Sequence, residues 1–204
     1  MFALVESGTI TQFPKGNKGI TIGDNQYPKT IYSLWTEAER NAIGIYTVEI
    51  DSTNKKDETF YINTDVTYTF TGSAVTGTYG TATAKRLNDE NAVDEDGNNV
   101  LDADGNQVIN YGLKTQYKNK FNAEAAGLLS RTDWYVIKAT DVTSYSVPSN
   151  ITTYRAAVRT KVNAMETSID GCSDVAALIT LLTYTTDSEG VTSRPLGEFP
   201  DEVV

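Results

Sequence analysis

The 204-residue sequence carries 17 basic and 27 acidic side chains and contains no histidine and a single cysteine. The missing histidine excludes a Ser-His-Asp triad, a Cys-His pair, and zinc or haem bound through imidazole. Cys172 alone cannot form an internal disulfide or a thiolate metal cage, so we expect it to be a small buried side chain. No apolar run reaches the ~18 residues of a membrane span, and the first residues lack the regions of a signal peptide, so we expect a soluble chain made in the cytosol.

The formal net charge of −10 is unevenly distributed along the chain. Residues 113–161 hold eight basic and three acidic side chains, a balance of +5, and the remainder holds nine basic and 24 acidic ones, a balance of −15. The acidic total argues against general nucleic-acid binding. The asymmetry indicates pairing between the basic segment and acidic parts of the same chain or of neighbouring copies, and solvated helix faces explain it equally well.

The first 50 residues predict a β-hairpin, a loop and a short helix. The runs 2–6 and 9–13 are short and partly apolar, and Ser7-Gly8 between them is a two-residue turn signal. A loop that begins at Pro14 and is rich in glycine follows. Thr36-Glu-Ala-Glu39 has the spacing of a capping box, and Gly44 is placed to end the helix in a left-handed conformation.

The next stretch predicts β-strands, because β-branched and aromatic residues predominate in it. The runs 45–50 and 59–70 each predict a strand, and 75–80 predicts a shorter one. Residues 51–57 and the sequence Thr71-Gly-Ser predict the turns between them.

An acidic repeat follows the predicted strands. Asp94-Glu-Asp-Gly-Asn-Asn-Val-Leu101 is followed directly by Asp102-Ala-Asp-Gly-Asn-Gln-Val-Ile109, and seven carboxylates lie between Asp89 and Asp104 without a cation. We expect two solvent-exposed Asp-Gly-Asn turns, each followed by two apolar residues in extended chain. A calcium loop is the alternative, since calcium takes several carboxylate ligands, although neither unit has the acidic spacing of an EF-hand.

The second half of the sequence predicts helices. Apolar residues at helical spacing lie on one face of a first helix, with Lys114, Lys118 and Asn122 turned away: Leu113, Tyr117, Phe121, Ala125 and Leu128. After Pro148 a second stripe follows, formed by Ile151, Tyr154, Val158, Met165 and Ile169, with Val162 beside it. Gly171 ends this helix, and Ser173 or Asp174 caps a third one over 175–182.

These elements predict an α+β protein with an N-terminal β-hairpin plus short helix, a β-rich middle and a C-terminal bundle of about three helices. We divide it into an N-terminal hairpin–helix module (1–50), a β-rich segment with the acidic repeat (51–110), a helical domain (111–183) and an extended tail without a periodic element (184–204). We expect the tail to be held against the rest of the chain.

The sequence indicates no catalytic chemistry. It contains no phosphate-binding loop followed by a helix and no G-x-S-x-G nucleophile elbow. A glycosidase could work with two carboxylates, but nothing singles out a pair among 27 acidic residues. We therefore expect a protein that is not an enzyme and that has no catalytic residues, cofactor or metal.

One region resembles a known family. Leu128-Leu-Ser-Arg-Thr-Asp-Trp134, followed after a connector with Pro148 by Ile151-Thr-Thr-Tyr-Arg-Ala-Ala-Val-Arg159, resembles a motif of bacteriophage tail-fibre-associated and tail-fibre assembly proteins. The residues that match are Leu128, Leu129, Asp133, Trp134, Tyr154, Arg155 and Arg159. Arg131 stands where that family often has a proline or a small residue, and the acidic repeat is not part of its pattern.

In physical terms the motif predicts a clasp between helices. We expect Trp134 to pack into the groove between the helices over 113–129 and 151–169. We expect Asp133 to cap the second element or to pair with Arg155. This role in holding the fold is favoured over direct contact with a partner.

The resemblance implies a non-enzymatic bacteriophage tail structural component, in the tail, the baseplate or the tail-fibre attachment region, acting through protein–protein contacts. Its implied partners are other tail or fibre proteins and further copies of itself, not nucleic acid or a membrane. Its implied place is the virion tail, after synthesis in the host cytoplasm. Two alternatives are a tail-fibre assembly chaperone absent from the mature virion and a carbohydrate-binding module for host adsorption.

Overall fold

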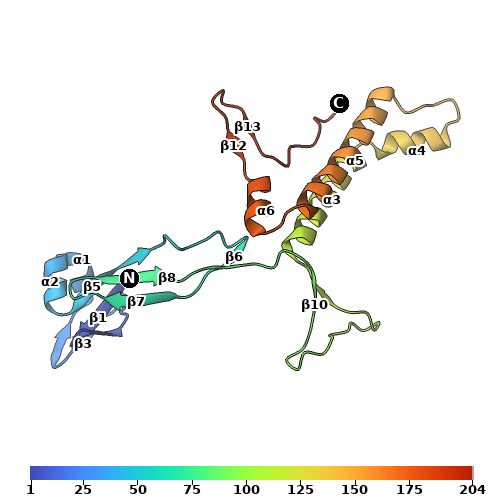
Figure 1. Cartoon of the computed structure of the whole chain (residues 1–204). Helices are drawn as coiled ribbons and strands as arrows, with labels where there is room; N and C mark the ends of the chain where they lie inside the picture. Colours follow the sequence, from blue (N-terminus) through green and yellow to red (C-terminus); the bar gives the residue numbers. More distant parts are fainter. Residues whose placement is uncertain (204) are drawn as a thin grey trace. The chain divides into compact units, whose positions relative to one another are not determined.

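The computed structural model describes residues 1–203 and divides the chain into two compact units, Met1–Thr83 and Ala84–Val204. The first unit is mostly sheet and the second contains the long helices, which confirms the predicted α+β class (Figure 1). The helices are α1 (Ile31–Leu34), α2 (Glu37–Ala42), α3 (Leu113–Ser130), α4 (Asp133–Asp141), α5 (Ser149–Asp170) and α6 (Val175–Leu182). The strands are β1 (Phe2–Glu6), β2 (Thr9–Gln12), β3 (Ile20–Ile22), β4 (Asn25–Tyr27), β5 (Ile45–Asp51), β6 (Tyr61–Ile62), β7 (Val66–Phe70), β8 (Val75–Tyr79), β9 (Thr83–Ala84), β10 (Glu90–Asn91), β11 (Ile109–Asn110), β12 (Thr185–Thr186) and β13 (Thr192–Ser193).

The first unit is built on a five-stranded sheet with the strand order β2-β1-β5-β8-β7. β5 and β8 pair in parallel, and the other neighbours pair antiparallel. The predicted hairpin is confirmed, because Ser7 and Gly8 both have positive φ, 51° and 80°, as a type I′ turn requires. Since β1, β5 and β8 share this sheet, the predicted division at residue 50 crosses a continuous sheet.

Alternation of side chains along the strands places an apolar cluster on each face of the sheet. One cluster consists of Ala3, Val5, Val48 and Val75, with Ile10, Tyr46, Tyr68 and Phe70 packed against it. The other consists of Leu4, Ile20, Ile31 and Ile45, so that α1 and β3 cover this face. The sheet thus has a core on both sides although the unit is small.

The short helix after the sheet's first hairpin begins and ends as predicted. The backbone N–H of Glu39 donates to Thr36 Oγ1 (3.3 Å), and Glu39 Oε2 accepts from the Thr36 N–H (2.7 Å), which completes a capping box. These bonds hold the pKa of Glu39 below its usual value. Gly44 has φ of 83°, and a Cβ there would lie 2.6 Å from the Val5 carbonyl oxygen, so both conformation and space require glycine.

Two predictions for the first unit are wrong. The expected loop after Pro14 contains the hairpin β3–β4, whose three-residue strands are too short for alternation to be recognised in the sequence. The run 59–70 is two strands, β6 and β7, and β6 pairs with β9 instead of extending the main sheet. Asn63 ends β6 by bonding through its side chain to the backbone N–H (2.8 Å) and carbonyl (2.9 Å) of Lys56.

The second unit centres on the antiparallel helices α3 and α5. Both predicted apolar stripes face this contact, and their buried members are Leu113, Phe121, Ala125, Ile151, Tyr154, Val158, Val162, Met165 and Ile169. Asp174 rather than Ser173 caps α6, since its Oδ1 accepts from the Ala177 N–H at 2.7 Å. Helix α4, between α3 and α5, brings the helical part to four helices. Among residues 1–203, no helix has both the length and the apolar composition that crossing a membrane requires.

Residues 184–203 are not a plain extended tail. They form the small hairpin β12–β13, which the sequence did not predict because its paired residues are threonines and a serine without apolar alternation. The chain then returns to the helices, as expected: Leu196 is buried, its N–H donates to the Leu181 carbonyl (3.1 Å), and its carbonyl accepts from Lys161 Nζ (2.7 Å).

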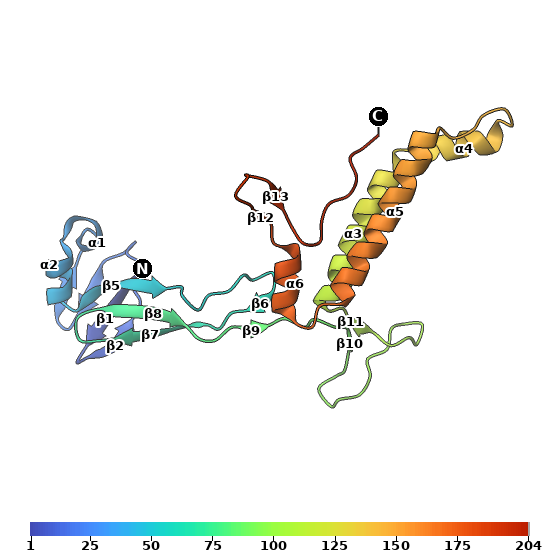
Figure 2. The same cartoon turned by 45° about the horizontal axis from the view of Figure 1, so that its top comes forward.

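Residues 89–111 form what we call the three-arm element, the loops around β10 in Figure 1 and around β10 and β11 in Figure 2. Three backbone hydrogen bonds close a ring: Ala92 N–H to the Val108 carbonyl (2.8 Å), Val108 N–H to Val100 (2.9 Å), and Val100 N–H to Ala92 (2.9 Å). Equivalent pairs recur every eight residues around this ring and are Val93 with Asn99, Leu101 with Gln107, and Ile109 with Asn91. The element therefore has approximate threefold symmetry, with two arms ending in Asp-Gly-Asn turns and the third leading to α3.

Candidate interaction site

The residues of the sequence motif lie where α3 ends and α4 begins, beside the N-terminal part of α5. Arg155 Nη1, on α5, donates to the Leu129 carbonyl (2.8 Å) and to Thr132 Oγ1 (2.6 Å), and it forms an ion pair with Asp133 Oδ1 (2.8 Å). The Arg155 side chain is almost buried, whereas that of Asp133 is half exposed. Of the two roles predicted for Asp133, the structure has the ion pair, and we call this group of contacts the Arg155 clasp.

The clasp also explains why the chain turns between α3 and α4. Thr132 is only 4% exposed, and its hydroxyl donates to the Leu129 carbonyl at 2.9 Å. That carbonyl lies in the last turn of α3 and also accepts from the Thr132 backbone N–H at 3.0 Å. Thr132 and Arg155 together satisfy it, so the break in the helix is stabilised by polar contacts.

The prediction for Trp134 is wrong. Its side chain is 50% exposed and does not fill the groove between α3 and α5. It lies on the adjacent Tyr135 ring (centroids 3.8 Å apart), and Lys138 Nζ lies 5.8 Å from its centroid. From sequence alone, an aromatic residue after a helix break suggests a buried side chain that holds the helices together. In the structure, Arg155 and not Trp134 makes the buried contacts at this junction.

Helix α4 as a whole presents apolar side chains to solvent. None of its nine residues is buried. Exposed apolar residues on α4 and just after it are Trp134, Val136, Ile137 and Val142, and Ile137 is 60% exposed. Trp134 and Ile137 lie on the same side of α4, about 60° apart, and Val136 lies nearly opposite Trp134. We call the four exposed side chains together the α4 surface.

The remaining motif residues divide between core and surface. Leu128 and Leu129 are half-buried on α3, and Tyr154 is buried on α5, where burial raises the pKa of its phenol. Arg159 is exposed, and Nη1 donates only a long 3.4 Å bond to the Arg155 carbonyl. The structure thus brings together Leu129, Asp133 and Arg155, and leaves Trp134 and Arg159 on the surface.

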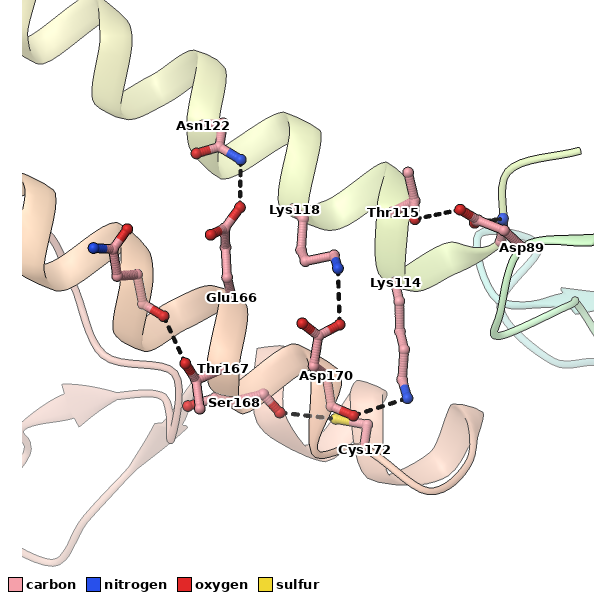
Figure 3. Close-up of polar contacts among 12 residues, drawn as sticks. Asp89, Lys114, Thr115, Lys118, Asn122, Glu166, Thr167, Ser168, Asp170 and Cys172 are labelled. Carbon is pink, nitrogen blue, oxygen red and sulfur yellow. Dashed lines mark hydrogen bonds and ion pairs between the residues drawn. The ribbon is translucent and has the colours of Figure 1, made fainter. Parts of the chain in front are cut away.

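A row of polar contacts between α3 and α5 was missed by the sequence reasoning (Figure 3). Lys118 Nζ contacts Asp170 Oδ1 at 2.8 Å, and Asn122 Nδ2 donates to Glu166 Oε1 at 2.6 Å. Lys114 Nζ donates to the Asp170 carbonyl at 2.9 Å. The hydrogen bond with Asp170 raises the pKa of Lys118. Residues 114, 118 and 122 were predicted to turn away; their four-residue spacing, matched by 166 and 170, is the signal that could have indicated this row.

The N-terminus of α3 is satisfied by the chain itself. Asp89 Oδ1 accepts from the Gly112 N–H (2.8 Å), and Asp89 Oδ2 accepts from the Thr115 hydroxyl (2.9 Å). The Arg86 carbonyl accepts from the Leu113 N–H (2.9 Å). Gly112 is required there, because a Cβ would lie 2.4 Å from the backbone of Asn88. This helix end therefore offers no free anion site.

The carboxylates of Asp94 and Asp102 accept hydrogen bonds within the two turns of the acidic repeat. Asp94 Oδ1 accepts from the N–H groups of Asp96 (3.0 Å) and Asn98 (2.8 Å), and Asp102 makes the same bonds to Asp104 (2.9 Å) and Asn106 (2.8 Å). The bonds from Asn98 and Asn106 hold the pKa values of Asp94 and Asp102 below their ordinary range. Across residues 1–203, no three Cys, Asp or Glu side chains gather as a metal would need. The calcium alternative therefore lacks a ligand set.

Cys172 is buried as expected, at the end of α5. Its thiol donates a weak bond to the Ser168 carbonyl at 3.5 Å, and burial raises its pKa. The thiol therefore stays protonated near neutral pH and is a poor nucleophile. It borders an open cavity of about 410 Å³ that is also lined by Ala177, Leu181 and Pro195.

Three of the eight basic residues of 113–161 form ion pairs in the described chain, all inside the second unit. Besides the contacts of Lys118 and Arg155, Arg131 forms an ion pair with Glu202. Lys138 lies over the Tyr145 ring, 4.4 Å from its centroid. Pairing within the chain thus accounts for part of the charge asymmetry, and exposed side chains such as Lys120 and Arg159 on the helices account for the rest.

Comparison with known proteins returned nothing: no protein-family model, no curated protein and no solved structure matches this chain.

Proposed function

We propose that this chain is a non-enzymatic structural component of a bacteriophage tail, in the tail, the baseplate or the tail-fibre attachment region. It acts through protein–protein contacts with other tail or fibre proteins, without nucleic acid or a membrane. It is made in the host cytoplasm and retained in the virion tail. The proposal draws on the resemblance of the Asp133-Trp134 and Tyr154-Arg155 motif and on the absence of histidine.

The α4 surface is the observation that carries this proposal. A nine-residue helix is marginal in water by itself, so a helix that buries none of its residues gains little from its own chain. Exposed tryptophan and aliphatic side chains gathered on such a helix are typical of contact surfaces. The Arg155 clasp holds the first turn of α4, so this surface is presented in a defined position.

The exposed area supports the same proposal. The chain exposes 13178 Å². Two separate compact domains of the lengths of the two units would expose about 11,300 Å² in total by the usual scaling of surface with mass. The excess of roughly 1,900 Å² compares with the ~800 Å² per partner that a standard interface buries. The chain therefore has surface to cover in an assembly.

Mass spectrometry of purified virions tests the proposal directly. We expect the chain in particles of the phage that encodes it. Its absence from particles, together with its presence in infected cells bound to fibre protein, would replace the structural role by that of an assembly chaperone.

A substitution on the α4 surface tests whether contact occurs there. Ile137→Ser removes an exposed apolar side chain, so we expect the amount of the chain in virions to fall about tenfold while the isolated protein keeps its stability. Val191→Ser, at a valine that is 56% exposed on the segment before β13, is the matched control and should leave incorporation unchanged. Equal incorporation of both variants would contradict a contact through α4.

A further inference from the structure

One face of the three-arm element carries three partly exposed apolar side chains, each beside the polar residue with which it is paired. Residues related by its threefold symmetry point to the same side, so Val93, Leu101 and Ile109 share one face. Their side chains are 56%, 56% and 36% exposed. These three apolar side chains stand at equivalent positions around a closed ring of hydrogen bonds, and each keeps a third or more of its surface exposed in the described chain.

The two Asp-Gly-Asn turns of the element add acidic side chains. Glu95, Asp96 and Asp104 are exposed in the two turns, and none of them has an ion-pair partner within the described chain. Residues 87–113 contain no lysine or arginine. Protein interfaces combine apolar and charged side chains, and the unpaired acidic side chains of this element match a basic partner surface.

The first unit carries a surface of the opposite charge. Residues 7–23 contain two lysines, Lys15 and Lys18, and no acidic residue. Both lysines are exposed, and neither forms an ion pair in the part of the chain that the structure describes. The loop 12–20 encloses a hollow of about 320 Å³ lined by these lysines and by Phe13, which is 40% exposed. We call this surface the lysine loop.

We propose that the three-arm element of one copy docks on the lysine loop of a second copy. Glu95, Asp96 and Asp104 face Lys15 and Lys18, and the apolar face covers Phe13. Because two different surfaces meet, each of two joined copies keeps one of its two surfaces free, and the contact joins copies head to tail. The inference goes beyond the proposed function, since it uses neither α4 nor another tail protein.

Sedimentation of the purified full-length chain tests this contact. We expect a mass above that of the monomer that rises with protein concentration and falls as salt is raised to about 0.5 M. Asp96→Lys with Asp104→Lys, or Lys15→Glu with Lys18→Glu, should weaken association roughly tenfold or more. All four substitutions together should restore it, because the charges are complementary again. Leu101→Ser should weaken association without changing the charge.

A general effect of net charge on association would not produce these results. The aspartate substitutions make the chain less negative and would favour association if general repulsion were in control, and the fourfold variant keeps the native net charge of −10. Lys56→Glu with Lys120→Glu changes the charge by the same amount as the lysine-loop variant, at exposed sites outside both surfaces, and should leave association close to that of the native chain. A native chain that stays monomeric at all concentrations, or a fourfold variant that stays dissociated, overturns the proposal. Ile137→Ser should not change association, so the outcome is separate from that for α4.

Discussion

Arg155 is the residue on which the junction of α3, α4 and α5 depends. Its Nη1 donates to the Leu129 carbonyl and the Thr132 hydroxyl and pairs with the Asp133 carboxylate. The planar group of an arginine is suited to several acceptors at once. The polar contacts of this junction thus converge on a single side chain.

We expect Arg155→Ala to destabilise the second unit by about 2–4 kcal/mol, because it leaves the Leu129 carbonyl and Thr132 hydroxyl with fewer partners and leaves Asp133 uncompensated. The free energy of unfolding in urea measures this effect, with helical circular dichroism as the signal.

Arg159→Ala is the matched control, one helical turn further along α5. Arg159 is exposed and makes only one long bond, so its loss should change stability by at most about 0.5 kcal/mol. Equal effects of the two substitutions would show that the clasp contributes nothing specific.

At this site, the place of Asp133 could be predicted from the sequence and the place of Trp134 could not. The pairing of Asp133 with Arg155 was predictable, because a carboxylate and a guanidinium that lie close together form an ion pair. The place of Trp134 was not, since an aromatic side chain suits both a core and an interface, and only the packing of α3 on α5 decides whether space remains for it. That space is filled by the apolar stripe of α5 and by Arg155.

At the scale of elements, glycine has opposite roles in β8 and in α3. A Cβ at Gly77 would lie 2.7–2.8 Å from side-chain atoms of Val66, Ile50 and Tyr68, which meet over that position. A Cβ at Gly127 would meet no atom within 4 Å, although the residue lies inside a helix.

We therefore expect Gly77→Ala to destabilise the first unit by about 1–3 kcal/mol through crowding. Gly127→Ala should stabilise the second unit by about 0.5–1 kcal/mol, because alanine has the higher helix propensity. Urea unfolding of both variants checks the signs. Destabilisation by Gly127→Ala would mean that the surface of α3 at that point is covered.

Long periodic elements were predictable and short ones were not. The stripes of α3 and α5 extend over four or more turns, so their period is evident, and the turn and cap residues at Ser7-Gly8, Thr36 and Gly44 act through local chemistry. The strands β3, β4, β12 and β13 have two or three residues each, and their pairing depends on contacts that no local pattern records. The third arm of the three-arm element was not predicted, because it lacks the Asp-Gly-Asn turn that marks the other two arms.

At the scale of the whole molecule, each unit has its own core and its own tryptophan. Trp35 lies in the first unit, where it packs edge-on to Tyr27 with centroids 5.9 Å apart, and Trp134 lies in the second. Neither apolar cluster of the sheet includes a residue beyond Thr83. The tryptophans are therefore separate reporters of the two units.

We expect the units to unfold in separate transitions. Trp134→Phe leaves Trp35 to report on the first unit, and Trp35→Phe leaves Trp134 to report on the second. Urea titrations followed by fluorescence should then give different midpoints. Gly77→Ala should shift the transition seen by Trp35, and Arg155→Ala the one seen by Trp134. Coincident midpoints that move together in both variants would mean one cooperative unit.

The ring of hydrogen bonds in the three-arm element limits how its gene segment can change length. Tandem repeats normally gain or lose copies by slippage during replication, and a linear array tolerates each step. Here Ala92, Val100 and Val108 close a circle, and a circle of three cannot accept a fourth member or lose one without opening. A variant that gained or lost one eight-residue repeat would lose the closed ring. We therefore expect the repeats to be kept in their present number.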